Sequence, residues 1–207
     1  MKRALILDLD NTIYPVSSIA ADVFNRLFAL IDEEGGDLSP EDKAKAKDEL
    51  TRRPYHSVAE RYSFSTELKN KGYEMLKAFS YDGPMYAFED YGSIRAIKLT
   101  KFLVTTGYSK LQWSKVKALG LEPDFAEIHI VDPEISSLTK KDVFADILKR
   151  HNYSADEVLV IGDDPESEIK AAIDLGIETF LFDPNERHTG ANSTYTSTSL
   201  TAVAPLL

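Results

Sequence analysis

The chain has 207 residues, enough for one substantial hydrophobic core or for a core with a small inserted module. Its 43% apolar and 28% charged residues are ordinary for a soluble globular protein, and the lack of cysteine excludes disulfides, thiolate nucleophiles and Cys-ligated zinc. The formal net charge of −10 argues against a nucleic-acid polymer as a partner, because no basic face is evident to offset the repulsion from phosphates.

The N-terminus reads MKRALILDLD, and its apolar run is too short and too acidic for a signal peptide. No apolar stretch of about 18 residues follows that could span a bilayer. We therefore expect a cytoplasmic protein without a membrane partner.

The first predicted strand, Ala4–Leu7, runs directly into two carboxylates, Asp8 and Asp10, and then into Thr12. At the carboxyl end of a strand, such groups lie at the rim where open α/β folds bind ligands. A divalent cation held between the carboxylates would let an anionic side chain attack an anionic phosphoryl group. Taken alone, the pair is equally compatible with solvated aspartates in an Asx-turn.

The segment from Val16 to Ser80 contains no strand-like run and is typical of helices. Apolar residues recur at helical spacing in its first part, at Ile19, Val23, Leu27 and Leu30. A second helix is expected to begin after Ser39, and a further one spans Thr66–Phe79. We predict an inserted all-helical domain at 16–81, with 1–15 and 82–207 forming the core.

The rest of the chain alternates apolar runs with helical patterns. The predicted strands are Phe102–Val104, Ala126–Val131, Val158–Ile161 and Thr179–Phe182. The predicted helices are Ser109–Leu119, Lys141–Arg150 and Glu166–Leu175. This alternation predicts right-handed crossovers and a doubly wound, Rossmann-like parallel sheet of the α/β class. The tail, 186–207, fits either an edge element or a loosely attached end.

A second carboxylate cluster follows the strand at Val158–Ile161. Gly162 leads into Asp163 and Asp164, and Glu168 comes five residues after Asp163. A loop followed by a first helical turn can direct Asp163 and Glu168 toward one hard cation, and oxygen ligands suit magnesium. Glu166 is expected only to support the start of the helix.

Two further polar groups lie between these clusters. Thr105, Thr106 and Gly107 follow a strand and precede a helix, a setting that favours phosphate oxygens, although such threonines are more often turn or cap residues. Lys140 and Lys141 open the next helix, where a lysine is poorly placed for the helix dipole. That placement indicates another use, although solvated lysines are common at such positions.

The order of these groups resembles the haloacid dehalogenase superfamily of phosphohydrolases. It runs Asp-x-Asp-x-Thr, then strand-Thr-Thr-Gly, then lysine, then strand-Gly-Asp-Asp, over Lys2 to about Pro184. The opening Asp-Leu-Asp-Asn-Thr-Ile-Tyr-Pro is most similar to pyrimidine-nucleotidase-like members. The resemblance implies a magnesium-dependent phosphomonoester hydrolase that acts on a small nucleotide or sugar phosphate beneath a helical cap.

The resemblance also implies a role for each motif residue. Asp8 would be the nucleophile that forms an aspartyl-phosphate, and Asp10 would protonate the leaving oxygen and then activate water. Thr105 and Lys140 would bind and stabilise the transferring phosphoryl group. The expected Mg²⁺ ligands are Asp8, Asp10 (through its backbone carbonyl), Asp163 and Asp164, and the expected substrate contacts are Thr12, Thr106, Gly107 and Lys141.

Two departures leave alternatives open. The lysine motif is Thr-Lys-Lys-Asp without a proline, so Lys141 competes with Lys140 for the motif role. The distal acid is Glu168 where many members have Asp, which favours an indirect part in metal binding, as for Asp164.

The wider function and the helical segment also leave alternatives. A sugar-phosphate mutase would use the same motifs, and an inactive metal-binding homologue or a dehalogenase fits the intact acids less well. The cluster Arg52, Arg53, Tyr55, His56 and Arg61 is compatible with a solvated helix end or with a clamp on the leaving group. The sequence defines neither the substrate nor the oligomeric state.

Overall fold

A parallel sheet of six strands, in the order β3-β2-β1-β4-β5-β6, forms the centre of the computed structural model, which describes residues 1–51 and 53–207. The strands are β1 (Ala4–Leu7), β2 (Thr100–Thr106), β3 (Glu127–Val131), β4 (Val158–Gly162), β5 (Glu178–Phe182) and β6 (Tyr195–Ser197). The five predicted strands are confirmed. The tail supplies β6, which pairs with β5 and so forms an edge of the sheet.

Eight α-helices are present within the described ranges. They are α1 (Ala20–Glu34), α2 (Pro40–Leu50), α3 (Tyr55–Arg61), α4 (Thr66–Ala78), α5 (Tyr91–Ala96), α6 (Ser109–Ala118), α7 (Lys140–His151) and α8 (Lys170–Ile173). The last predicted helix is divided in two. A π-helical turn, η4 (Pro165–Ile169), precedes α8, and Ser167 within it has non-helical φ and ψ angles of −108° and −105°.

The two faces of the sheet bury separate sets of side chains. Leu5 and Leu7 of β1 belong to a core cluster that includes residues of α5, α6 and the C-terminal 3-10 turn η5 (Leu200–Ala202). Ala4 and Ile6 belong to a second cluster with residues of α7 and α8. Alternate residues of a strand face opposite sides of its sheet, so β1 is covered on both faces. The doubly wound α/β prediction is confirmed.

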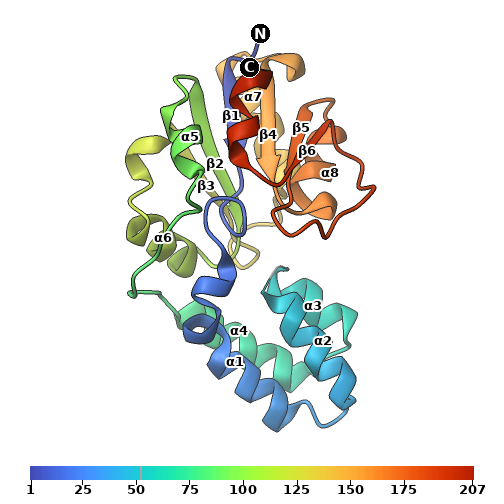
Figure 1. Ribbon diagram of the computed structural model, residues 1–207. Coiled ribbons are helices and arrows are strands. Elements are labelled where there is room, and N and C mark those ends of the chain that lie inside the picture. Colours follow the sequence, from blue (N-terminus) through green and yellow to red (C-terminus); the bar gives the residue numbers. More distant parts are fainter. Residues whose placement is uncertain (52) are drawn as a thin grey trace.

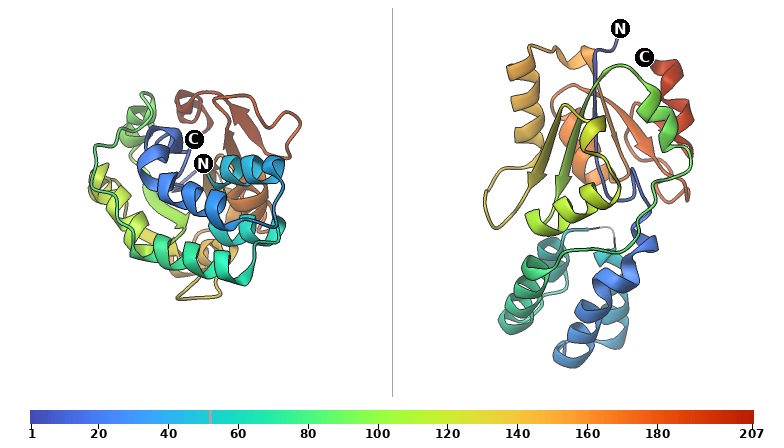
Figure 2. Two further views of the ribbon diagram at one scale, coloured as in Figure 1. Left: turned by 90° about the horizontal axis from the view of Figure 1, so that it is seen from below. Right: turned by 90° about the vertical axis from the view of Figure 1, so that its left-hand side faces the viewer.

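Helices α1–α4 lie together beyond one end of the sheet, opposite the end at which both termini emerge (Figures 1 and 2). They share a hydrophobic cluster, which also includes Tyr108 at the start of α6. Ser39 and Ser65 cap α2 and α4 by accepting hydrogen bonds from backbone N–H groups in the first turn of each helix. The start of the helical segment packs against the core. Val16, Ile19 and Val23 belong to the same cluster as Leu5 and Leu7 of β1. Among the described residues, no helix is long and apolar enough to cross a membrane.

Candidate active site

The carboxyl ends of β1, β2 and β4 meet at the centre of the sheet, and each carries a polar residue. Asp8 follows β1, and its backbone N–H donates to the carbonyl oxygen of Ile161 at 3.0 Å, which extends the pairing with β4. Thr105 lies near the end of β2, and Asp163 follows β4. From β1 the chain adds β2 and β3 on one side of the sheet and then β4, β5 and β6 on the other, so the strand order changes side between β1 and β4. Open α/β sheets bind ligands at such a point.

The ammonium group of Lys140, the first residue of α7, lies between two carboxylates. Its Nζ donates to Oδ1 of Asp8 at 2.6 Å and to Oε2 of Glu168 at 2.7 Å. All three side chains are buried. Thr139 and Asp142 form a capping box that fixes this end of α7, so the lysine is held against the carboxyl end of β1.

Lys141 lies in a different environment. Its side chain is exposed, and its Nζ is 3.6 Å from a carboxylate oxygen of Asp174. It lines a neighbouring cavity on the α8 side rather than the one that contains Asp8. The geometry thus gives Lys140, and not Lys141, the contact with Asp8.

Three carboxylates converge beside Lys140. One oxygen each of Asp8, Asp163 and Glu168 lie within 4.8 Å of one another. Removal from water raises the pKa of Asp8 and of Asp163, and the negative charge of Glu168 adds to the rise. A divalent cation would relieve this repulsion, and an all-oxygen donor set suits Mg²⁺, so the residues present fit that ion.

Asp164 and Thr12 each form a hydrogen bond to a member of this group. The carboxylate of Asp164 accepts from the backbone N–H of Glu166 at 2.8 Å, while its own N–H donates to Oε1 of Glu168 at 2.7 Å. Asp164 thereby fixes the start of η4 and the position of Glu168. The Thr12 hydroxyl is buried and donates to Asp163 at 3.4 Å, so it supports an acid rather than lining the cavity.

The carboxylate of Asp10 is held by three side chains of the core. Its Oδ1 accepts from the Tyr14 hydroxyl and, at 2.8 Å, from Nζ of Lys115. Its Oδ2 accepts from Nε2 of Gln112 at 2.9 Å. Burial would raise the pKa of Asp10, but Lys115 and the hydrogen bonds from Tyr14 and Gln112 bring it below its usual value. The metal contact expected of Asp10 therefore concerns its backbone carbonyl.

Gln112 also reaches the end of β2. Its Nε2 donates to Oγ1 of Thr105 at 2.7 Å, which leaves the proton of that buried hydroxyl free to point toward a ligand. The neighbouring Gly107 has a φ of +153°, and a Cβ there would lie 3.1 Å from the Gln112 side chain. A glycine at 107 thus makes room for the amide that joins Thr105 to Asp10.

The sequence model of a protein family, the haloacid dehalogenase-like hydrolases, matches residues 2–176 of this chain. The chain belongs to this family. Two named relatives are phosphatases. The "Glyceraldehyde 3-phosphate phosphatase" of Methanopyrus kandleri is 24% identical over 195 residues, covering 86% of this chain and 83% of the relative. The "Ribulose-1,5-bisphosphate 5-phosphatase" of Halopiger xanaduensis is 33% identical over 98 residues, covering 47% of this chain and only 39% of the relative.

Solved structures of the family share the fold. The crystal structure of the putative HAD-hydrolase YfnB from Bacillus subtilis, in a form bound to magnesium, covers all of this chain and 98% of its own. Its TM-score is 0.67 and its sequence identity 21%. At that identity the likeness extends to the fold alone.

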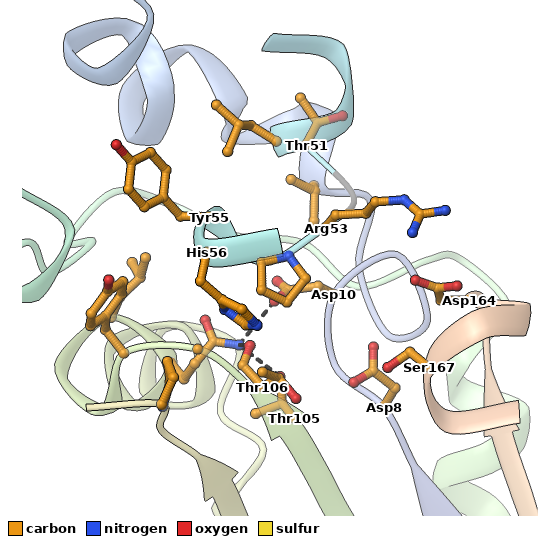
Figure 3. Close-up of a pocket in the computed structure, with 18 of the residues that line it drawn as sticks. Asp8, Asp10, Thr51, Arg53, Tyr55, His56, Thr105, Thr106, Asp164 and Ser167 are labelled. Atoms are coloured by element: carbon orange, nitrogen blue, oxygen red, sulfur yellow. Dashed lines mark hydrogen bonds between the residues drawn. The ribbon is translucent and has the colours of Figure 1, made fainter. Parts of the chain in front are cut away.

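A cavity of about 120 Å³ separates the strand ends from α3. Asp8, Asp10, Thr105, Thr106 and Gly107 line it from the sheet. The opposite wall is largely apolar and comes from the helical segment; it includes Val16, Phe24, Leu50, Pro54, Tyr55 and Leu76. Figure 3 shows Tyr55 and His56 on the α3 side of the cavity, with Asp8, Thr105 and Thr106 across from them.

The residues of the basic cluster noted in the helical segment lie in different places. Arg53 lines the cavity, and its guanidinium group donates to Oε2 of Glu166 at 2.8 Å. Glu166, expected only to support a helix start, is therefore also an ion-pair partner. Arg61 lies outside the cavity and pairs with Glu49 at 3.0 Å. Arg52 lies outside the described residues.

Sequence reasoning missed Tyr14, Gln112 and Lys115. Gln112 and Lys115 are three residues apart on α6, so they share a helix face, and they are buried although the pattern assigned that helix an apolar face. The available signal was a Gln and a Lys at helical spacing from Val116 and Leu111, the apolar residues of the same helix. His56, which the sequence assigned either to a solvated helix end or to a clamp on the leaving group, lines the cavity that contains Asp8.

Proposed function

We propose that the chain hydrolyses a phosphomonoester of a small phosphorylated metabolite, with Mg²⁺ and through a phosphorylated Asp8. The observation that carries this proposal is the buried contact of Lys140 with both Asp8 and Glu168, beside Asp163. A phosphatase that forms an aspartyl-phosphate needs a carboxylate nucleophile, a compensating cation and a metal-binding acid at one point. Membership of the family and the phosphatase names of two relatives support the same chemistry.

In the proposed reaction, a carboxylate oxygen of Asp8 bonds to phosphorus and the bond from phosphorus to the leaving oxygen breaks. Asp10, 28% exposed and facing the cavity, gives the leaving oxygen the proton that it accepts from water in the second step of the previous turnover. Water then attacks phosphorus, Asp10 accepts a proton from it, and the bond to Asp8 breaks. Lys140 keeps Asp8 in place and compensates its charge, and the Thr105 hydroxyl donates to a phosphoryl oxygen.

Asp8, Asp163 and the backbone carbonyl of Asp10 would hold the magnesium ion, with Glu168 and Asp164 behind them. When bound, the ion supplies positive charge that lowers the repulsion between Asp8 and the phosphoryl group. The pKa values of Asp8 and Asp163, raised by burial and by neighbouring acids, support a cation at this point.

We further propose that residues 16–81 form a cap that faces the leaving group. The mainly apolar wall from the helical segment favours a weakly charged leaving group over one that carries a second phosphate. We propose a short sugar phosphate as the substrate, as named for the Methanopyrus kandleri relative. The "interdomain movement" described for magnesium-bound YfnB supports opening and closing of such a cap.

The test is phosphate release across short sugar phosphates, nucleoside monophosphates and aryl phosphates, with Mg²⁺ or with chelator. We expect turnover only with Mg²⁺, with triose and other short sugar phosphates preferred. Equal turnover in chelator would contradict the metal. Transfer of the phosphoryl group within a sugar phosphate, without release, would identify a mutase instead.

A further inference from the structure

We propose that Lys115 is a positioning residue that acts through Asp10, with Gln112 as its partner on the same face of α6. The inference rests on the proposed phosphatase function and deepens it. It concerns which atom of Asp10 exchanges the proton and what keeps that atom directed at the leaving group.

The two oxygens of Asp10 differ in how many donors they meet. A carboxylate oxygen has two lone pairs. Oδ1 accepts from both the Tyr14 hydroxyl and Nζ of Lys115, so its lone pairs are taken. Oδ2 accepts from Gln112 and keeps one lone pair for a proton. Proton exchange with the leaving oxygen, and later with water, is therefore assigned to Oδ2.

The Tyr14 hydroxyl can act only as a donor in this arrangement. Its partner is a carboxylate oxygen of Asp10, which accepts the hydrogen bond. The Lys115 ammonium group lies 5.9 Å from the centroid of the Tyr14 ring. Lys115 and Tyr14 thus fix Oδ1 together, and the carboxylate cannot rotate to exchange its two oxygens without losing both contacts.

The burial of Lys115 needs an explanation beyond the stability of α6. Its side chain is only 6% exposed, whereas Lys110 and Lys117 on the same helix are exposed. Desolvating an ammonium group is costly, and a buried ion pair gives little net stability compared with a well-packed apolar residue. Leu111 and Val116 beside it show that this side of α6 accepts apolar residues. A lysine at 115 is better explained by what it does to Asp10.

The effect on catalysis follows from geometry. Proton transfer requires the donor oxygen within hydrogen-bond distance of the leaving oxygen, and a displaced carboxylate loses that alignment. A poor leaving group, such as the alkoxide of a sugar phosphate, depends on the proton. An activated aryl phosphate leaves without it. Loss of Lys115 should therefore slow alkyl phosphates more than aryl phosphates, which need Asp10 only as the base of the second step.

The experiment compares Lys115→Met with Lys117→Met, an exposed lysine on the same helix as the matched control. Lys115→Met should lower kcat for an alkyl phosphate from the active panel by about 10- to 100-fold, less than the full contribution of about 10²–10⁴-fold from general acid–base catalysis because Asp10 itself remains; KM should change little. Turnover of p-nitrophenyl phosphate should fall much less. Lys117→Met should match the wild type on both substrates.

A double-mutant cycle separates positioning from a general defect. If Lys115 acts through Asp10, the Lys115→Met change should have no added effect on p-nitrophenyl phosphate or the alkyl ester in an Asp10→Asn background. If Lys115→Met does not fold, as judged by its thermal transition, Lys115→Gln enters the same cycle, because it removes the charge and keeps a donor.

Three results would overturn the inference: equal losses on both substrates, the same loss in the Asp10→Asn background, or a raised KM with an unchanged kcat, which would make Lys115 a substrate contact. Each of these requires an active wild-type enzyme. A wild type that releases no phosphate from any ester refutes the proposed function itself and this inference with it.

Discussion

The Arg53 guanidinium group and the Glu166 carboxylate form an ion pair of 2.8 Å that joins the α2–α3 connection to the start of η4. Arg53 is the cationic side chain that the described helical segment contributes to the lining of the cavity containing Asp8. In Figure 3 its guanidinium group extends to the side on which Asp164 lies, away from Tyr55 and His56. The pair thus connects the helical segment to the residues that follow β4, beside the cavity.

Arg53→Ala should change the ranking of substrates, because it removes a cation from the cavity wall. Phosphate esters whose leaving groups carry hydroxyl or anionic groups should lose kcat/KM relative to p-nitrophenyl phosphate, by about 10-fold for one lost charged hydrogen bond. Arg61→Ala is the matched control, since Arg61 pairs with Glu49 outside the cavity. The same ranking for both variants and the wild type would show that Arg53 does not contact substrate.

Asp8→Asn should abolish turnover on every phosphate ester while leaving the fold intact, because an amide is a poor nucleophile toward phosphorus. Loss of a nucleophile typically costs about 10⁴-fold or more. Phosphate release measures the loss, and the thermal transition checks the fold. Mass spectrometry of the quenched wild type should detect an added phosphoryl group that the variant lacks. A variant that turns over at near the wild-type rate would rule out the covalent route.

The strands and the first carboxylates were predictable because they depend on local signals. β1 is an uninterrupted apolar run that stops at Asp8, and β4 repeats the pattern before Asp163. Burial on both faces of a parallel sheet requires such runs, so these strands can be recognised in the sequence. The same signal failed for β6, whose residues, Tyr195–Ser197, are only partly buried at the edge of the sheet.

The convergence of Asp163 and Glu168 was predictable from their spacing, but the individual contacts of the acids were not. Asp164 and Glu168 both follow β4, but the non-helical Ser167 turns Glu168 inward to Lys140 while Asp164 caps η4. Which of two adjacent lysines meets Asp8 depends on the register of α7, which the capping box at Thr139 sets. The Lys115–Asp10 pair joins residues 105 positions apart, and neither residue's neighbours in sequence indicate it.

Asp163→Asn and Asp164→Asn should differ in their effect on magnesium. Asp163 offers an oxygen to the group formed with Asp8 and Glu168, whereas the Asp164 side chain bonds to the Glu166 backbone. Asp163→Asn should weaken Mg²⁺ binding about 10-fold or more in titration calorimetry, and Asp164→Asn should weaken it less, as for residues that orient ligands. A larger loss for Asp164→Asn would reverse the assignment of the two acids.

Glu127→Gln should destabilise the fold at neutral pH and much less in acid. Glu127 accepts two hydrogen bonds from Arg150, at 2.9 and 2.7 Å, and one each from His151 and His129. These bonds, that of Arg150 first, hold its pKa well below the usual value. A lowered folded-state pKa stabilises the fold above the unfolded-state pKa, and that stabilisation is lost as the pH falls.

Urea unfolding of the wild type and of Glu127→Gln measures the difference. We expect about 1–2 kcal/mol at pH 7, reduced from the full value of charged hydrogen bonds because the site is partly exposed. The difference should shrink as the pH falls below the usual glutamate pKa of about 4.5. A difference that stays constant from pH 7 to pH 3 would mean that the ionised state of Glu127 contributes nothing.

The last prediction concerns Gly162, the residue at which the end of β4 and the acid cluster meet. A Cβ at this position would lie 2.2 Å from both Cγ and Oε1 of Glu168, closer than any real contact. Glu168 is 1% exposed, so it cannot swing into solvent without breaking its bonds to Lys140 and to the Asp164 N–H. Gly162→Ala should therefore lower the free energy of unfolding by about 1–3 kcal/mol through overpacking and weaken Mg²⁺ binding as well.

Gly92→Ala in α5 is the matched control for this change, because a Cβ there meets nothing within 4 Å. At a helical position of this kind, alanine should be neutral or stabilise by up to about 1 kcal/mol, with Mg²⁺ binding unchanged. Thermal unfolding and titration calorimetry measure both quantities on both variants. If Gly162→Ala matches Gly92→Ala in its free energy of unfolding and its Mg²⁺ affinity, then Glu168 can move away without cost. Its contact with Lys140 would then not be needed for the fold or for Mg²⁺ binding.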